Sequence, residues 1–353
     1  MLIVPNHQDD AITMRTHPHD AMTKTVFFFL LIAGSWRHAQ AQIPEKLFAG
    51  VGKTLDRHAP TLGLHVSGLS EPEWKKLSWP GFAVRTATVS VATGSPKLLL
   101  GGANGILHPF PNPTGWQLLT GWRLTEILDV KIDPLDPRRI FAATASGIYV
   151  SKDNGREWKP SNDGLLHSFV SCLLIDPKQR ERLLAGTEEG LFESLDNGEH
   201  WRLLAFPGVA IRALLREPES WPGIFWVGTE YHGLYESFDG GATFEAVDLE
   251  RDSISVYALA GGGAHAPIYA GVFERGMYRA SSPGENWMHL EGTEKLGTVL
   301  CILPIDELRM IFAGTHQQGV MKSADSGRTW QSFGLQGGPV RVLLLGEADY
   351  CQP

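Results

Sequence analysis

Short apolar runs separated by tight polar turns make up most of the chain. In a representative stretch, apolar runs lie at 169–175, 182–187 and 190–194, and a more polar run at 200–204 follows the turn at 196–198. Runs of this length bounded by turn residues are typical of β-strands, because helices are usually longer. The pattern predicts four antiparallel strands within about 40 residues.

The same unit of four runs recurs along the chain at a nearly constant period. An aromatic residue stands at the start of the fourth run, and successive aromatics are 42 or 43 residues apart: Trp74, Trp116, Trp158, Trp201, Phe244, Trp287 and Trp330. Four short strands per unit of about 40–45 residues are typical of a β-propeller blade. We therefore predict an all-β protein, a seven-bladed β-propeller of four-stranded antiparallel blades.

The two ends of the repeat array complement each other. The first unit, at 47–77, has no apolar first run before it, whereas the chain ends with a spare run at 339–346. We expect this C-terminal strand to complete the N-terminal blade, which would close the ring and protect its sheet edges from pairing with other chains.

The chain before the repeats has the pattern of an export signal. Lys24 precedes the apolar run 26–33, and the small residues at 39–41 form a cleavage site before Gln42. An uncleaved anchor is the alternative interpretation, although the run is too short to span a bilayer.

This pattern divides the chain into two parts. We expect residues 1–41 to be an N-terminal extension and signal peptide, with Met1, Met14 or Met22 as the start, and residues 42–353 to be the propeller. The propeller is therefore expected to be a secreted or periplasmic monomer without integral membrane insertion.

The composition argues against several classes of partner. The net charge is −8, with 31 basic and 39 acidic residues, so the basic surface that usually binds nucleic acid is not expected. Cys172 and Cys301 occupy the same repeat position three blades apart, too far for a disulfide, and are expected to be buried thiols. No spacing typical of a metal site or a cofactor motif is present, and none is expected.

Four of the aromatics follow the motif Ser-x-Asp-x-Gly-x-x-Trp/Phe. Its aspartates are Asp153, Asp196, Asp239 and Asp325, and its aromatics include Trp158, Trp201 and Trp330. A short polar side chain at a turn accepts backbone N–H bonds, and glycine supplies the positive φ. The aromatic is expected to be buried between sheets, at about 2–3 kcal/mol each. The aspartates lie one blade apart and cannot converge on one ligand, so we predict a structural role.

This motif resembles the Asp-box, or BNR, repeat of sialidases, xyloglucan-hydrolysing endoglucanases, sortilin-type receptors and the Ycf48/HCF136-like photosystem II assembly factors. The resemblance implies a propeller but says little about function, because the Asp-boxes of these proteins lie away from their active sites. Sialidases have six blades and an Arg-Ile-Pro motif that is missing here, and the xyloglucan enzymes have two propellers. A single exported seven-bladed propeller is most similar to the Ycf48/HCF136-like group, which implies an assembly or stability factor that binds protein.

The face away from the Asp-box turns is where a ligand is expected. Its loops join the second and third runs of a unit or connect successive units. The candidate binding residues in these loops are Trp122, Arg123, Glu188, Tyr231, His232, Arg275 and His316.

Three arginines share one place in the repeat. Arg85, Arg212 and Arg341 each follow a repeat aromatic by eleven residues and begin a first strand near the channel. On the seven-blade count they belong to blades 2, 5 and 1, so Arg212 faces the other two. Guanidinium groups suit carboxylate, phosphate or acidic protein groups. The alternative is that each arginine binds the loop carbonyls of its own blade.

The loop carboxylates permit a second function. Glu188, Glu230 and Glu274 could supply an acid and base pair for glycoside hydrolysis, although exposed loop glutamates are common. Our leading interpretation has no catalytic residue. It is an exported propeller that binds a protein partner or an extracellular glycan through its channel face. A glycoside hydrolase is the alternative, and a purely structural domain is the third interpretation.

Overall fold

The computed structural model describes residues 45–53, 62–77, 81–90, 97–110, 115–166, 169–179, 181–217, 220, 222–249, 253–261 and 266–346. The predicted signal peptide lies outside them. Within these residues no helix is long and apolar enough to cross a membrane.

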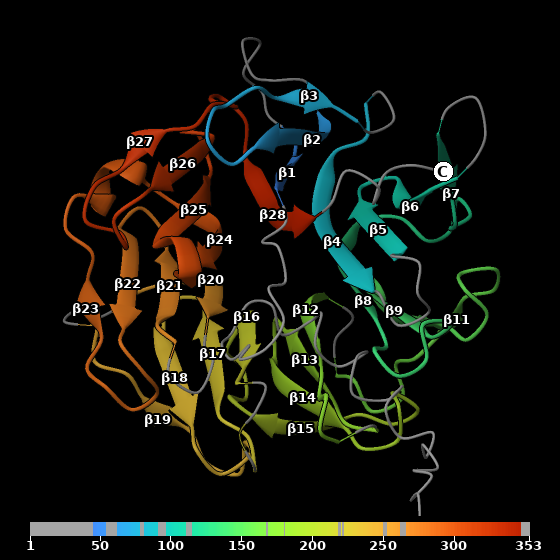
Figure 1. Cartoon of the computed structure of the whole chain (residues 1–353). Helices are drawn as coiled ribbons and strands as arrows, with labels where there is room; N and C mark the ends of the chain where they lie inside the picture. Colours follow the sequence, from blue (N-terminus) through green and yellow to red (C-terminus); the bar gives the residue numbers. More distant parts are fainter. Residues whose placement is uncertain are drawn as a thin grey trace, which may run out of the picture.

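The described chain folds into seven four-stranded antiparallel sheets arranged in a ring (Figure 1). Blade 1 contains β28 (Val340–Gly346), β1 (Lys46–Val51), β2 (Gly63–Gly68) and β3 (Lys75–Lys76). Blade 2 contains β4 (Val84–Ser90), β5 (Lys97–Gly102), β6 (Gly105–Pro109) and β7 (Trp116–Leu118). Blade 3 contains β8 (Ile127–Ile132), β9 (Ile140–Thr144), β10 (Gly147–Ser151) and β11 (Lys159–Pro160).

The remaining four blades continue the series. Blade 4 contains β12 (Val170–Ile175), β13 (Leu183–Thr187), β14 (Gly190–Ser194) and β15 (Arg202–Ala205). Blade 5 contains β16 (Ile211–Arg216), β17 (Phe225–Thr229), β18 (Leu234–Ser237) and β19 (Glu245–Ala246). Blade 6 contains β20 (Val256–Gly261), β21 (Ile268–Val272), β22 (Gly276–Ala280) and β23 (Met288–His289). Blade 7 contains β24 (Val299–Ile305), β25 (Met310–Thr315), β26 (Val320–Ser323) and β27 (Gln331–Ser332), and the short 3-10 helices η1 (Thr293–Leu296) and η2 (Asp306–Leu308) lie in loops.

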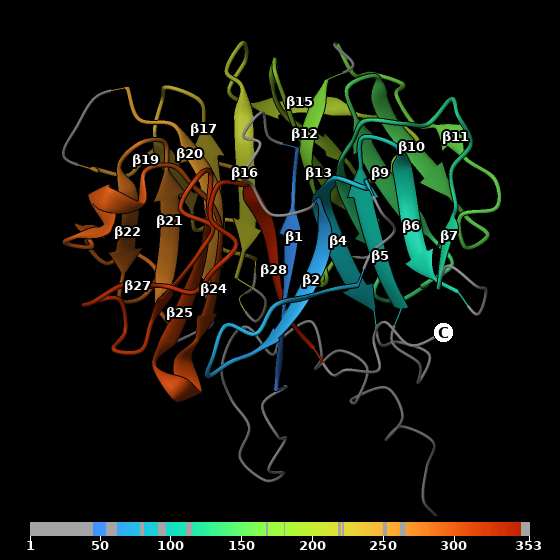
Figure 2. The same ribbon diagram turned by 90° about the horizontal axis from the view of Figure 1, so that it is seen from above.

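The C-terminal strand closes the ring, as the sequence predicts. β28 pairs with β1 in antiparallel register from Lys46 opposite Gly346 to Val51 opposite Val340. The two strands lie side by side in both views (Figures 1 and 2). β28 is also the innermost strand of blade 1, so the first blade takes its central strand from the end of the chain.

Three of the repeat aromatics join their blade to the one before it through an indole hydrogen bond. The indole Nε1 of Trp116 donates to the carbonyl of Leu77 at 2.9 Å, and that of Trp201 donates to the carbonyl of Ser161 at 2.9 Å. Trp74 makes the equivalent bond across the closure of the ring, to Phe333 of blade 7 at 2.6 Å. A buried indole N–H group needs a hydrogen-bond partner, and each of these partners is a carbonyl of the preceding blade. The bonds therefore fix how each tryptophan packs against that blade.

The other repeat aromatics use different contacts. Trp287 and Trp226, from neighbouring blades, both donate to the buried carboxylate of Glu236, at 2.7 and 2.9 Å. Trp330 donates only within its own turn, to Gly327. Phe244 has no donor and packs against Phe206, with ring centroids 5.0 Å apart. Trp116, Trp201 and Trp287 are buried, whereas Trp74, Trp158, Phe244 and Trp330 are only partly buried. The hydrogen-bond partners of these aromatics are not visible in the sequence pattern.

The four Asp-containing turns share one geometry. In the first, the Ser151 hydroxyl donates to Asp153 at 2.8 Å and accepts from the amide of Gly155, while Asp153 accepts from the amide of Glu157. Asp239 and Asp325 also accept from the hydroxyls of Thr243 and Thr329 at 2.6 Å. These bonds stabilise the ionised carboxylate, so they lower the pKa of Asp239 and of Asp325 to about 2.

Deleting residues 339–353 should destabilise the whole ring, because it removes β28 and its buried Val340, Val342 and Leu343. We expect the free energy of unfolding in urea to fall by at least about 5 kcal/mol, from the loss of apolar burial alone. Deleting only 347–353 removes no residue of β28 and is the matched control. Equal urea midpoints for the two deletions would contradict closure by β28.

Replacing Thr243 with Val should raise the pKa of Asp239 toward its ordinary value of 3.8, because the hydroxyl donor is lost. The stabilisation that this carboxylate contributes is present above its unfolded pKa and is lost as pH falls toward 2. Carboxyl carbon NMR during a pH titration measures the change, with Asp325, whose Thr329 is intact, as the internal control. A pKa of Asp239 that stays at that of Asp325 would show that the hydroxyl is unimportant.

Candidate functional site

The innermost strand of every blade contains a β-bulge at the same place. In each, the strand register with its neighbour shifts across the second residue, which therefore has no partner opposite it. The seven bulge residues, in ring order from blade 1, are Arg341, Arg85, Leu128, Ser171, Arg212, Tyr257 and Leu300. A bulge redirects a side chain and increases local twist, so these seven positions form one ring around the channel.

Glycines next to the bulges let neighbouring blades approach closely. A Cβ on Gly101 would lie 2.6 Å from Thr86 and 2.7 Å from Ile127 of the next blade. A Cβ on Gly186 would lie 2.8 Å from Ile211, again the residue before a bulge in the next blade. Glycine is required at these positions because any Cβ atom would collide with the next blade and force the two blades apart. Neither glycine has the positive φ that would by itself favour glycine.

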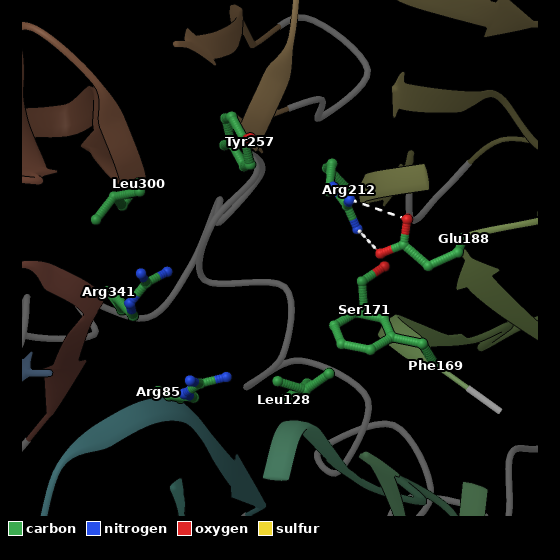
Figure 3. A pocket seen from close by; sticks show the side chains of 9 residues that line it. All are labelled: Arg85, Leu128, Phe169, Ser171, Glu188, Arg212, Tyr257, Leu300 and Arg341. Carbon is green, nitrogen blue, oxygen red and sulfur yellow. Dashed lines mark hydrogen bonds and ion pairs between the residues drawn. The ribbon is translucent and has the colours of Figure 1, made fainter. Parts of the chain in front are cut away.

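The bulge ring borders a cavity of about 350 Å³ at one end of the channel. The residues lining it are the seven bulge residues together with Phe169 and Glu188 (Figure 3). The structure brings Arg85, Arg212 and Arg341, which share one position in the repeat, to the lining of this one cavity. In Figure 3, Arg85 and Arg341 lie together on one side, and Arg212 lies on the other.

Arg212 is held by two carboxylates. Its guanidinium donates to Glu188 through both terminal nitrogens, at 2.8 and 3.2 Å, and also donates to Glu230. The hydroxyl of Tyr257 donates to the other oxygen of Glu230 at 3.5 Å. Burial alone would lower the pKa of Arg212, but the hydrogen bonds to Glu188 and Glu230 outweigh it and raise that pKa.

Arg85 and Arg341 have much less compensation. Arg85 lies 3.7 Å from Glu126, and both side chains are about half exposed. Among the described residues no carboxylate forms an ion pair with Arg341, whose side chain is exposed to the cavity. Loss of surrounding water, and then the nearby charge of Arg85, lower the pKa of Arg341. This side of the cavity therefore carries uncompensated positive charge.

The other predicted binding residues do not line the cavity. The Trp122 side chain is 82% exposed and has the Arg123 guanidinium 4.9 Å from its ring centre. Tyr231 is also exposed, and His232 bonds the backbone carbonyl of Glu230. His316 and Arg275 contribute backbone bonds to loops, and the candidate glutamate Glu274 has a left-handed backbone with φ of 54°.

Four of the bulge residues, and Phe169, were not among the binding residues predicted from the sequence. Leu128 follows its repeat aromatic by 12 residues, and Ser171, Tyr257 and Leu300 follow theirs by 13. One or two extra residues in the loops between blades displace them from the eleven-residue spacing of the arginines. Aligning the units on the apolar first run, rather than on the aromatic, would have identified all seven positions.

The two described cysteines are free thiols in partly buried positions. Cys172 and Cys301 are unpaired, and burial raises the pKa of both thiols to about 12. Among the described residues, no three His, Cys, Asp or Glu side chains are grouped so as to hold a metal ion.

Comparison with known proteins supports the propeller fold. No family model matches the chain, and no curated protein matches it in sequence. Among solved structures, a GH74 xyloglucanase from Xanthomonas campestris matches with a TM-score of 0.59 and 18% identity, over 71% of this chain and 45% of the enzyme. YCF48 from Cyanidioschyzon merolae matches with a TM-score of 0.54 and 15% identity, over 73% of this chain and 87% of YCF48. YCF48 bound to a D1 peptide matches with a TM-score of 0.52 and 16% identity, over 71% of this chain and 81% of that one.

These identities are low enough that the similarity concerns the fold alone. The chain spans less than half the length of the xyloglucanase that it matches. The seven-bladed propeller is therefore established, with both glycan-acting enzymes and a peptide-binding protein among its structural neighbours.

Replacing Arg212 with Gln should destabilise the protein, because Glu188 and Glu230 would be left side by side without a cation. We expect a loss of about 1–2 kcal/mol, less than for a fully buried pair because Glu188 is partly exposed. Urea unfolding measures the loss. Arg85→Gln is the matched control and should change stability by less than about 0.5 kcal/mol, since its pair with Glu126 is half exposed. Equal losses in the two variants would refute this assignment.

Proposed function

We propose that this protein is an exported, non-catalytic binding protein that holds an anionic group of a protein partner at the mouth of its channel. Arg85 and Arg341 bind the anion, whereas Arg212 stays paired with Glu188 and Glu230. Export rests on the apolar run and cleavage motif before residue 42.

The observation that carries this proposal is the pairing of Arg85 with Arg341 in a confined cavity. Two guanidinium groups on adjacent blades line the same space, and Arg341 has no carboxylate partner among the described residues. Two guanidinium groups with little carboxylate compensation attract an anion into the cavity, so a carboxylate should bind through charge-assisted hydrogen bonds. The structure of YCF48 bound to a D1 peptide supports the proposal, because it is a protein of similar fold that binds a peptide.

A glycoside hydrolase is the second candidate, favoured by the similarity of fold to the GH74 xyloglucanases. It requires a carboxylic acid that can donate a proton and a second carboxylate placed across the scissile bond. Glu188 and Glu230 instead both accept hydrogen bonds from the guanidinium of Arg212, so both are part of one internal ion pair rather than placed on opposite sides of a scissile bond. The arginine site is therefore the better supported of the two.

A pull-down from the exporting cell tests the proposal directly. The double variant Arg85→Ala/Arg341→Ala should recover at least about tenfold less of the main partner than the wild type, because a charge-assisted bond is worth about 1.5–3 kcal/mol. Quantitative mass spectrometry of the recovered proteins measures the difference.

The matched control removes the same charge from the opposite face. Arg156 and Arg328 are exposed residues of Asp-containing turns, so Arg156→Ala/Arg328→Ala should recover the partner normally. Equal recovery by both double variants would show that the channel arginines do not bind the partner. Release of sugar from xyloglucan by the purified wild type would favour the hydrolase instead.

A further inference from the structure

The two sides of the cavity carry opposite net charge. On one side, Arg85 and Arg341 contribute two positive charges, and Glu126 offsets part of them from 3.7 Å. On the other side, one guanidinium meets two carboxylates, so the group of Arg212, Glu188 and Glu230 has a net charge of −1. The cavity is therefore dipolar across its width (Figure 3).

The negative side can still accept hydrogen bonds. Glu188 lines the cavity, and each of its two carboxylate oxygens accepts one hydrogen bond from Arg212. A carboxylate has about four lone-pair sites, so acceptor capacity remains on Glu188. Arg212 has one positive charge against the two carboxylates, so one negative charge remains on this side, shared by Glu188 and Glu230.

Apolar side chains occupy the space between the two charged sides. Leu128 and Phe169 lie on one wall, between Arg85 and Glu188, and Leu300 lies on the opposite wall near Arg341 (Figure 3). An aliphatic segment of a ligand would contact these side chains without leaving a polar group unpaired. With a volume of about 350 Å³, the cavity is at the small end of ligand sites and suits a short spacer.

We infer that the cavity binds a dipolar ligand, in which a carboxylate at Arg85 and Arg341 and an ammonium at Glu188 are joined by a short aliphatic chain. This inference rests on the proposed function and adds the second charged group and the spacer. A polypeptide that ends in lysine carries both groups on its last residue, and a free ω-amino acid has the same chemistry.

Calorimetric titration with three matched probes tests the inference on the purified full chain. 6-Aminohexanoate has both charges, hexanoate has only the carboxylate, and hexylamine has only the ammonium. We expect 6-aminohexanoate to bind about tenfold more tightly than hexanoate, because it adds a charge-assisted hydrogen bond in a partly exposed site. Hexylamine should bind most weakly, since Arg85 and Arg341 repel it.

Three variants assign the effect to residues. Glu188→Gln should abolish the preference for 6-aminohexanoate and leave the affinity for hexanoate within about twofold. Glu230→Gln should also reduce the preference, because Arg212 would then neutralise Glu188. Arg341→Gln should weaken both carboxylate probes by about tenfold. Near-UV circular dichroism checks that each variant is folded.

The outcomes separate this inference from the proposed function. Equal binding of hexanoate and 6-aminohexanoate to the wild type, with both weakened by Arg341→Gln, would overturn the dipolar ligand and keep the anion site. Binding that Arg341→Gln leaves unchanged, or no binding of either probe, would overturn both. A peptide ending in lysine, compared with its C-terminal amide, identifies the source. Tighter binding of the free acid supports a protein terminus, and failure of both peptides while 6-aminohexanoate binds would show that the protein terminus is wrong.

Discussion

The ring depends on the contact that each blade makes with the blade before it. Indole N–H groups of Trp74, Trp116 and Trp201 cross these boundaries and donate to backbone carbonyls of the preceding blade. The bond of Trp74 joins the first blade to the last, so it acts together with the pairing of β1 and β28. β28 covers the edge of β1 that would otherwise be exposed in an incomplete three-stranded blade, which explains why the chain ends are brought into one sheet.

The same close packing determines where a ligand can bind. Glycines such as Gly101 and Gly186 let the first strand of the next blade approach, and the bulge beside each glycine inserts one side chain into the ring. The fold thus supplies seven equivalent positions, and the residues at those positions decide the chemistry. Here those positions hold three arginines, one tyrosine, one serine and two leucines, and Glu188 adds a carboxylate beside Arg212.

Most of the fold could be predicted from the sequence, because a period of 42 or 43 residues is a strong one-dimensional signal. The arginine positions were predictable because their distance from the aromatic is constant. Leu128 and Tyr257 were missed because loops of unequal length shift them by one or two residues. The pairing of Arg212 with Glu188 and Glu230 could not be predicted, since it joins a residue of β16 to residues of two different loops, whose side-chain directions depend on packing. That pairing changes the interpretation, because it removes Arg212 from the expected anion site.

The central claim is that Arg85 and Arg341 are available to an anion while Arg212 is not. NMR of the arginine side chains, with Nε and Cζ signals assigned by single Arg→Lys variants, tests it during a titration with hexanoate. The account predicts saturable shifts for Arg85 and Arg341, with the signals of Arg212 nearly constant because its carboxylate partners stay in place. Shifts confined to Arg212, or no saturable shift at Arg341, would contradict it.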